Sequence, residues 1–263
     1  MSENCNHECS NCEHANNCES AEPIKLEPNE NSKIARVIGV VSGKGGVGKS
    51  LVCGLLATKL QKKGKSVGIL DADITGPSVP KMFGITEQLT ATEGAMNPAV
   101  SKSGIKMVSA NLILDNPSNP VAWRGPVISG AIQQFFNQVN WGDVDVLLVD
   151  MPPGTSDVFL TVMQSLPIDG IVIATTPQTL VDMIVKKATS LAKMMNIKVL
   201  GMVENMAYFK CPDCDKKHYI YGEPDGDATD ELPLDANFAR MCDDGKIEDI
   251  DTDDLLNNII KEI

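Results

Sequence analysis

VVSGKGGVGKS, residues 40–50, joins an apolar run (36–42) to a helical pattern over 49–63. Within it, Gly43, Gly48, Lys49 and Ser50 match the spacing G-x-x-x-x-G-K-[ST] in the strand, loop and helix order that this motif requires. Glycines let successive backbone N–H groups point at one phosphate, and the N-terminus of the following helix adds positive potential. The motif therefore predicts a loop that binds the phosphates of a nucleotide.

Polar side chains at this loop and at two strand ends supply the other groups that a nucleotide-hydrolysing site needs. We expect Lys49 to reach the β- and γ-phosphates and Ser50 to offer its hydroxyl to Mg²⁺, which prefers oxygen ligands. Asp150 ends one apolar run, and Asp73 closely follows another. We expect Asp150 to approach the Mg²⁺ and Asp73 to orient the attacking water, because phosphoryl transfer depends mainly on positioning and charge neutralisation. Asp71 could take the second role or support the metal from behind, and a turn or helix cap is the alternative.

Short apolar runs alternate along the chain with segments long enough for crossover helices. The runs are rich in Val, Ile and Leu and mostly continuous, which is typical of strands buried on both faces of a parallel sheet. They cover residues 36–42, 66–71, 105–110, 144–150, 170–176 and 198–204, and helical examples are 49–63, 126–138 and 179–195. The pattern predicts an α/β fold with a doubly wound, mainly parallel sheet.

Composition changes sharply near residue 32. Residues 1–31 are rich in Asn, Glu, Ser and Cys, so we expect a flexible extension ahead of a domain over 32–263. Its segment CNHECSNCEHANNC (5–18) is expected to bind a metal, which would act as the core that the extension lacks. Adventitious metal binding by a flexible tail is the alternative. The candidate ligands are Cys5, Cys9, Cys12 and Cys18, with His7 or His14 as competitors for the fourth position.

Charge and cysteine usage narrow the functional classes. The 263 residues carry a net charge of −12 with a pI near 4.7, which repels phosphate backbones and anionic lipid. We therefore expect no nucleic acid and no membrane as partners. No run approaches the ~18–20 apolar residues of a membrane span, and the N-terminus is unlike a signal peptide, so we expect a cytoplasmic protein. In that reducing setting, eight cysteines point to metal or redox chemistry.

A second cysteine pair, Cys211 and Cys214, forms a C-x-x-C just beyond an apolar run. Two thiolates at this spacing can hold one metal or two corners of an iron–sulfur cluster. A two-fold axis through paired loops would bring four thiolates together. A zinc ribbon half-site and a redox dithiol are the alternatives. We expect Cys53 to pack within its helix, and we assign no role to Cys242.

The chain resembles a known family of nucleotide-binding proteins. Lys44, directly after Gly43, gives the loop the deviant Walker A motif of the MinD/ParA/nitrogenase-iron-protein class. Within that class, residues 34–245 are similar to the Mrp/ApbC iron–sulfur carrier ATPases. The motifs are DADITGPS (71–78), AWRGP (122–126), DMPPGTSD (150–157), TTPQ (175–178), ENM (204–206), CPDC (211–214) and LPLD (232–235).

The resemblance implies a P-loop ATPase that carries [4Fe-4S] clusters to apo iron–sulfur proteins. It implies an ATP-sandwich homodimer in which Lys44 reaches the partner's nucleotide and the cluster bridges two C-x-x-C pairs. Asn205 and residues 233–235 would contact adenine, and the spacing of Cys9, Cys12 and Cys18 matches an N-terminal cluster of some members. The implied phosphate cradle comprises Gly43, Gly45, Gly46, Val47, Gly48, Lys49, Ser50 and Leu51.

One departure and two other functions bear on this expectation. Leu51 stands where the family usually has Thr, whose hydroxyl meets the α-phosphate, so we expect slow turnover. An electron-transfer ATPase like the nitrogenase iron protein is one alternative, although that class ligates its cluster with widely separated cysteines. A MinD/ParA-type spatial regulator is the other, although the acidic C-terminus DTDDLLNNIIKEI (251–263) does not suit an anionic-membrane anchor.

Overall fold

The computed structural model describes residues 25–74, 76, 78–92, 94–114, 123, 125–154, 156–177, 179–222 and 226–263. The strands are β1 (Lys33–Ser42), β2 (Val67–Asp71), β3 (Thr90–Thr92), β4 (Ala95–Asn97), β5 (Ala99–Val100), β6 (Lys106–Val108), β7 (Asp143–Asp150), β8 (Gly170–Thr175), β9 (Lys198–Lys210), β10 (Lys217–His218) and β11 (Asp230–Pro233). The helices are α1 (Lys49–Lys62), α2 (Val79–Met82), α3 (Gly125–Asn137), α4 (Asp157–Ser165), α5 (Thr179–Met194), α6 (Ala236–Asp243) and α7 (Ile259–Glu262), with 3-10 turns η2 (Ala110–Leu112) and η3 (Ile247–Asp249).

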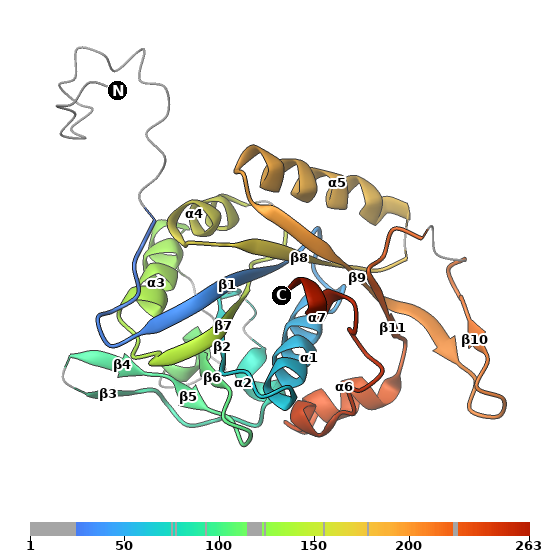
Figure 1. The fold of residues 1–263 in the computed structure, drawn as a ribbon, viewed down its shortest axis with the longest axis horizontal. Coiled ribbons are helices and arrows are strands. Elements are labelled where there is room, and N and C mark those ends of the chain that lie inside the picture. Colours follow the sequence, from blue (N-terminus) through green and yellow to red (C-terminus); the bar gives the residue numbers. More distant parts are fainter. Residues whose placement is uncertain are drawn as a thin grey trace, which may run out of the picture.

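The strands of the described residues form a nine-stranded sheet in the order β10-β9-β8-β1-β7-β2-β6-β5, with β11 also paired to β9 (Figure 1). The pairs between β9 and β6 along this order are all parallel. The outermost pairs, β10 with β9 and β5 with β6, are antiparallel. The prediction of a doubly wound, mainly parallel sheet is confirmed.

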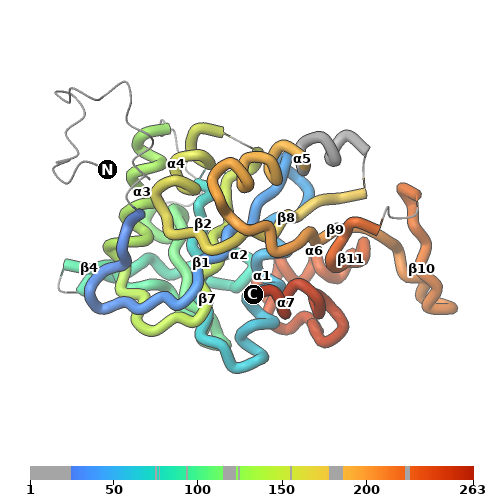
Figure 2. Tube along the Cα trace, turned by 45° about the horizontal axis from the view of Figure 1, so that its top comes forward, coloured from blue at the N-terminus to red at the C-terminus, as the bar shows by residue number. Residues whose placement is uncertain are grey.

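Helices cover both faces of the sheet, with α3, α4 and α5 on one side and α1, α6 and α7 on the other (Figure 2). Two apolar clusters fill the spaces between these layers. In β1, Ile38 and Val40 belong to the cluster on the α1 side, whereas Val37 and Val41 belong to the cluster on the α3 side. Because both faces of β1 are buried from residue 37 onward, its sequence there is continuously apolar rather than alternating.

Several elements depart from the sequence-based expectations. The run at 105–110 is a strand only as far as Val108 and then turns into η2, whereas β9 continues past 204 to Lys210. Strands β3, β4, β5 and β10, of two or three residues each, were not predicted. Of the helices in the described part of the chain, none has the length and apolar character that crossing a membrane would require.

The described residues ahead of β1 lie against the domain. The Nζ of Lys25 donates to the carbonyl of Met163 at 2.8 Å, and the backbone N–H of Leu26 donates to the carbonyl of Ser165 at 2.8 Å. Leu26 also packs on the apolar cluster beneath α3 and α4. Cys5, Cys9, Cys12 and Cys18, together with His7 and His14, lie outside the described residues.

Candidate nucleotide and metal-cluster sites

The glycine-rich loop runs from the end of β1 to the first turn of α1. Gly46 and Gly48 have φ angles of +80° and +84°, which L-residues with a Cβ rarely adopt. A Cβ at Gly46 would meet nothing within 4 Å, whereas a Cβ at Gly48 would lie 2.2 Å from Nδ2 of Asn205. The loop therefore keeps open space above Gly46 and requires a glycine at 48, where Asn205 closes against it.

Lys49 and Ser50 both turn toward Asp150. The Nζ of Lys49 lies 2.6 Å from Oδ1 of Asp150, and the Ser50 hydroxyl donates to Oδ2 at 2.5 Å. The register explains this meeting, because Asp150 at the end of β7 is level with Val40 of β1, just ahead of the loop. The predicted grouping of these three side chains at one sheet edge agrees with the described geometry.

Asp71 and Asp73 complete an acidic group around this lysine. Asp71 pairs directly with Asp150 across β2 and β7, and Oδ2 of Asp73 lies 3.7 Å from the Nζ of Lys49. Burial, together with the charge of Asp150, raises the pKa of Asp71 to about 8. Burial alone would lower the pKa of Lys49, but the three carboxylates raise it above its ordinary value.

These groups suit a phosphate and a Mg²⁺ ion. The hydroxyl of Ser50 and the carboxylate of Asp150 are adjacent oxygen donors, the ligand type that Mg²⁺ selects. The ammonium of Lys49 is fixed beside them, and the N-terminus of α1 opens at Lys49 with its loop at Gly45 and Gly46 exposed. Lys49, Ser50 and Asp150 would therefore hold a Mg-nucleotide between them.

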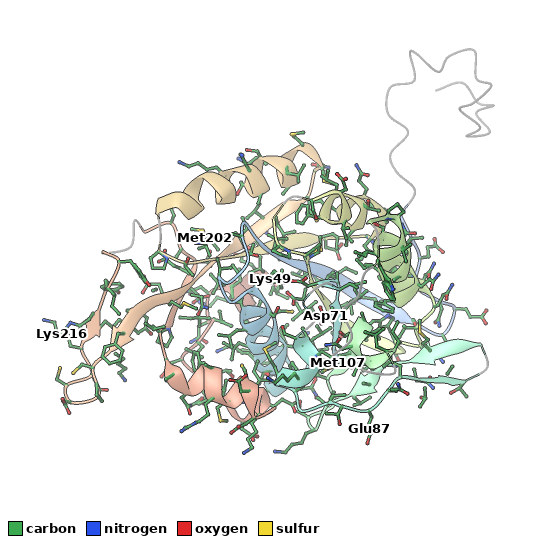
Figure 3. All side chains as sticks on the ribbon, turned by 180° about the vertical axis from the view of Figure 1, so that it is seen from behind. Lys49, Asp71, Glu87, Met107, Met202 and Lys216 are labelled. Atoms are coloured by element: carbon green, nitrogen blue, oxygen red, sulfur yellow. The ribbon has the colours of Figure 1, made fainter. Side chains whose placement is uncertain are left out.

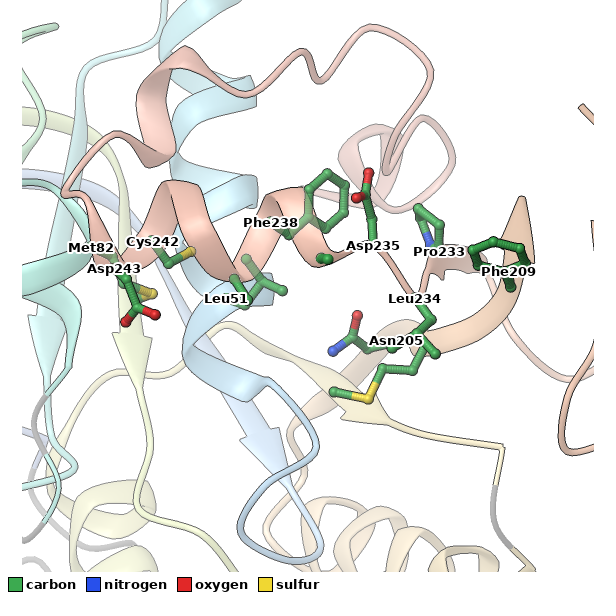
Figure 4. Close-up of a pocket in the computed structure, with 13 residues that line it drawn as sticks. Leu51, Met82, Asn205, Phe209, Pro233, Leu234, Asp235, Phe238, Cys242 and Asp243 are labelled. Carbon is green, nitrogen blue, oxygen red and sulfur yellow. The ribbon is translucent and has the colours of Figure 1, made fainter. Parts of the chain in front are cut away.

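A cavity of about 540 Å³ adjoins the loop on the side of α6 (Figure 4). Asn205 reaches its edge and donates from Nδ2 to the carbonyl of Val47 at 2.9 Å, which ties β9 to the phosphate loop. Leu51 forms part of the wall, with Phe238 of α6 nearby. The remaining lining residues are Met82, Met206, Phe209, Pro233, Leu234, Asp235, Ala236, Ala239, Cys242 and Asp243. Mostly apolar walls next to a phosphate loop suit the flat ring of a nucleobase.

Cys211 and Cys214 lie apart from this cavity, in the turn between β9 and β10. Figure 1 shows the hairpin extending from the edge of the sheet, and Figure 3 labels Lys216 at its outer end and Lys49 in the interior. Both thiols are free, with Cys214 exposed and Cys211 half-buried. Hydrogen bonding by the backbone of Asp213 and Cys214 lowers the pKa of Cys211, which favours the thiolate that binds metal. Among the described residues, no third His, Cys, Asp or Glu completes a metal site here.

Cys53 and Cys242, the other two thiols of the described residues, have raised pKa values and are therefore less reactive. Burial raises the pKa of Cys53 well above its ordinary value, in agreement with the packing role predicted for it. Cys242 lines the cavity, and burial together with Asp243 raises its pKa to about 11. Lys44, at the tip of the phosphate loop, is half-buried, and its carbonyl accepts a hydrogen bond from the Ser42 hydroxyl at 3.1 Å.

Sequence reasoning did not single out two contributors to these sites. Ser109 lies at 0% exposure just after β6 and donates to Oδ2 of Asp71 at 3.0 Å. A polar residue directly after a buried strand was the signal that could have found it. Phe238 lies in α6, more than 180 positions from the phosphate loop, and no local pattern connects it with the cavity.

A phosphate loop with a converging lysine, serine and aspartate at the edge of a parallel sheet defines a P-loop NTPase, here of the MinD/ParA type. The family model for ParA, described as NUBPL iron-transfer P-loop NTPase, matches residues 33–263. The chain belongs to this family of iron-transfer P-loop NTPases.

Named relatives and solved structures agree with this assignment. An iron-sulfur cluster carrier protein of Clostridium perfringens is 44% identical over 97% of this chain and 95% of its own. One from Methanocaldococcus jannaschii is 44% identical over 92% of this chain and 89% of its own. A nucleotide-binding protein from Archaeoglobus fulgidus, solved with ADP, has a TM-score of 0.73 at 41% identity and covers 82% of this chain and 88% of its own. MinD from Pyrococcus horikoshii, at 17% identity and a TM-score of 0.59 over 88% of this chain and 94% of its own, shares the fold.

Proposed function

We propose that the protein is a cytoplasmic, slowly hydrolysing ATPase that binds [4Fe-4S] clusters and passes them to apo iron–sulfur proteins. The cluster is its cargo, held by Cys211 and Cys214 of two copies in a homodimer, since each copy supplies two thiolates and the cluster takes four. The four N-terminal cysteines hold a second metal centre. The family, the names of the relatives and the ADP-bound neighbour support this function.

One observation carries the proposal: a single strand, β9, serves both sites. Asn205 touches the phosphate loop, Phe209 lines the cavity, and Cys211 follows directly after the strand ends at Lys210. Phe209 also pairs with His218 of β10, so a ligand that moves Phe209 acts on the hairpin that carries the thiols. Because β9 runs through both sites, we expect a change at the nucleotide to reach the cluster ligands.

The residues around the phosphate loop divide the tasks of binding and hydrolysing the nucleotide. Lys49 and the backbone N–H groups of residues 43–50 bind the phosphates, and Ser50 and Asp150 hold Mg²⁺, which when bound neutralises charge that develops on them. Asp73 orients the attacking water, and Asp71 supports this edge from behind. Lys44 acts on the nucleotide of the partner subunit. Asn205 and residues 233–235 hold the adenine in the cavity.

Iron analysis of anaerobically reconstituted protein tests the cargo site. Cys211→Ser in the full chain is expected to lower the iron content by about two atoms per chain, half of a shared cluster. Cys242→Ser is the matched control, because this thiol is half-buried in the cavity wall and should leave the iron unchanged. Equal iron in wild type and Cys211→Ser, or stoichiometric zinc in its place, would contradict the proposal.

Transfer to an apo [4Fe-4S] acceptor tests the link with the nucleotide. Mg-ATP is expected to change the transfer rate of the wild type and to leave that of Lys49→Ala unaltered, because this variant lacks the ammonium that faces the phosphates. A transfer rate that is indifferent to Mg-ATP in the wild type would separate the two sites and remove the coupling.

A further inference from the structure

A buried chain of hydrogen bonds leads from β6 to the aspartate that faces Lys49. The hydroxyl of Ser109 donates to Oδ2 of Asp71 at 3.0 Å, and Oδ1 of Asp71 accepts the backbone N–H of Asp73 at 3.2 Å. Ser109 and Asp71 are 0% and 1% exposed, so water does not compete for the bond between them. Ser109 is itself held, because its oxygen accepts the backbone N–H of Asn111 at 3.4 Å where η2 begins.

We propose that Ser109 is a positioning residue for ATP hydrolysis, acting through Asp71 to fix the backbone of Asp73. The inference rests on the proposed function, in which Asp73 orients the attacking water. It goes beyond that function by assigning the orientation of Asp73 to a serine that directly follows another strand, β6.

The geometry explains why the serine is needed. Asp71 ends β2, and the chain leaves the sheet at Ala72, whose N–H is bonded to the carbonyl of Asp150 at 2.9 Å. Beyond that point, the N–H of Asp73 donates to the Asp71 carboxylate, and this bond ties the backbone of Asp73 to the sheet edge. That carboxylate can rotate about two side-chain bonds, and the donation from Ser109 fixes one of its oxygens. Without the hydroxyl, Asp71 loses a buried donor, and the carboxylate that anchors Asp73 is held less firmly.

This arrangement predicts a specific kinetic signature. Ser109 lies outside the phosphate loop, so a variant at this position should still bind Mg-ATP through Lys49 and the loop amides. The chemical step depends on placing the water, and small misplacements of a catalytic group cost between about tenfold and 100-fold in rate. Ser109→Ala is therefore expected to lower kcat by about tenfold or more while KM for Mg-ATP stays within about twofold.

Steady-state ATPase kinetics on the full chain test the inference, with three variants of Ser109. Ser109→Thr keeps the hydroxyl and should restore kcat toward the wild-type value. Ser109→Cys has the same shape with a slightly larger side chain and donates weakly, so its kcat should lie between those of the wild type and Ser109→Ala. If Ser109→Ala does not fold, the intermediate kcat of Ser109→Cys carries the test.

Ser101→Ala is the matched control. Ser101 is also buried, donates to a carboxylate, Oε1 of Glu248, at 2.7 Å, and accepts the backbone N–H of Ile105 at 3.1 Å. It lies at the other end of the β6 segment, so its removal should lower the melting temperature and leave kcat unchanged.

The outcomes separate the inference from the function it rests on. A wild-type kcat in both Ser109→Ala and Ser109→Cys, in a protein that hydrolyses ATP, would overturn the positioning role alone. Parallel losses of melting temperature, KM and kcat, with no recovery in Ser109→Thr, would reduce Ser109 to a structural residue and overturn it as well. A wild type that binds Mg-ATP without hydrolysing it would overturn both the ATPase and this inference.

Discussion

Replacement of Gly48 by alanine tests how tightly β9 closes on the phosphate loop. The φ of +84° at this position costs an L-residue about 1–2 kcal/mol. The new Cβ would also lie 2.2 Å from Nδ2 of Asn205, so this side chain must leave its place. Asn205 is 1% exposed, and loss of its 2.9 Å bond to Val47 leaves buried polar groups unpaired. That loss costs about 1–3 kcal/mol more.

The expected total is a loss of about 2–5 kcal/mol in the free energy of unfolding without nucleotide. For a domain of this size, about 2–4 °C of melting temperature corresponds to each kcal/mol, so the midpoint should fall by roughly 5–20 °C. Denaturant or thermal unfolding followed by circular dichroism measures the change. Gly46→Ala is the matched control, because its φ of +80° brings the same backbone strain with nothing within 4 Å of the new Cβ.

The double variant separates strain from collision. Once Gly48→Ala has displaced Asn205, the further change Asn205→Ala should cost less than it does in the wild-type background, since the bond to Val47 is already broken. Two results would refute the reasoning: equal destabilisation by Gly46→Ala and Gly48→Ala, or an identical cost of Asn205→Ala in both backgrounds.

Other variants test the remaining assignments. Lys49→Ala should abolish the stabilisation by Mg-ATP, about 3 kcal/mol in the wild type at 100 times Kd, as read from thermal shifts; an unchanged shift would contradict the phosphate site. Lys44→Ala should keep that shift but lower kcat, and wild-type turnover would remove its action on the partner's nucleotide. Leu51→Thr should raise kcat by supplying a hydroxyl at the loop. Leu51→Val is the control, because valine has the shape of threonine without the oxygen; equal ATPase rates of these two variants would refute the prediction. Deletion of residues 1–24 should leave the unfolding midpoint unchanged, whereas deletion of residues 1–31 should lower it because the contacts of Lys25 and Leu26 are lost. Equal midpoints of the two truncated proteins would show that those contacts contribute nothing to stability.

The phosphate loop and the central strands were predictable because local chemistry determines them. A glycine-rich turn with Lys49 and Ser50 functions only between a strand and a helix, and burial on both faces makes residues 146–149 of β7 continuously apolar. The edge of the sheet was not predictable in the same way. Strands β5 and β10 have two residues each and exist through their partners β6 and β9, so their own sequences carry no period. The cavity likewise depends on α6, which folds back from far along the chain.

The acidic group around Lys49 has a consequence for how the nucleotide enters. Lys49 faces the carboxylates of Asp73 and Asp150, with Asp71 beside them, so acidic side chains outnumber the lysine where phosphates must bind. The Nζ of Lys49 lies 2.6 Å from Oδ1 of Asp150, so a second cation beside that carboxylate would help to release the ammonium toward the phosphates. Two adjacent oxygens, from Ser50 and Asp150, are placed to hold a divalent ion at that position. We therefore expect nucleotide binding to depend on Mg²⁺, because the Asp150 carboxylate that restrains Lys49 in this structure is also a candidate ligand of that ion.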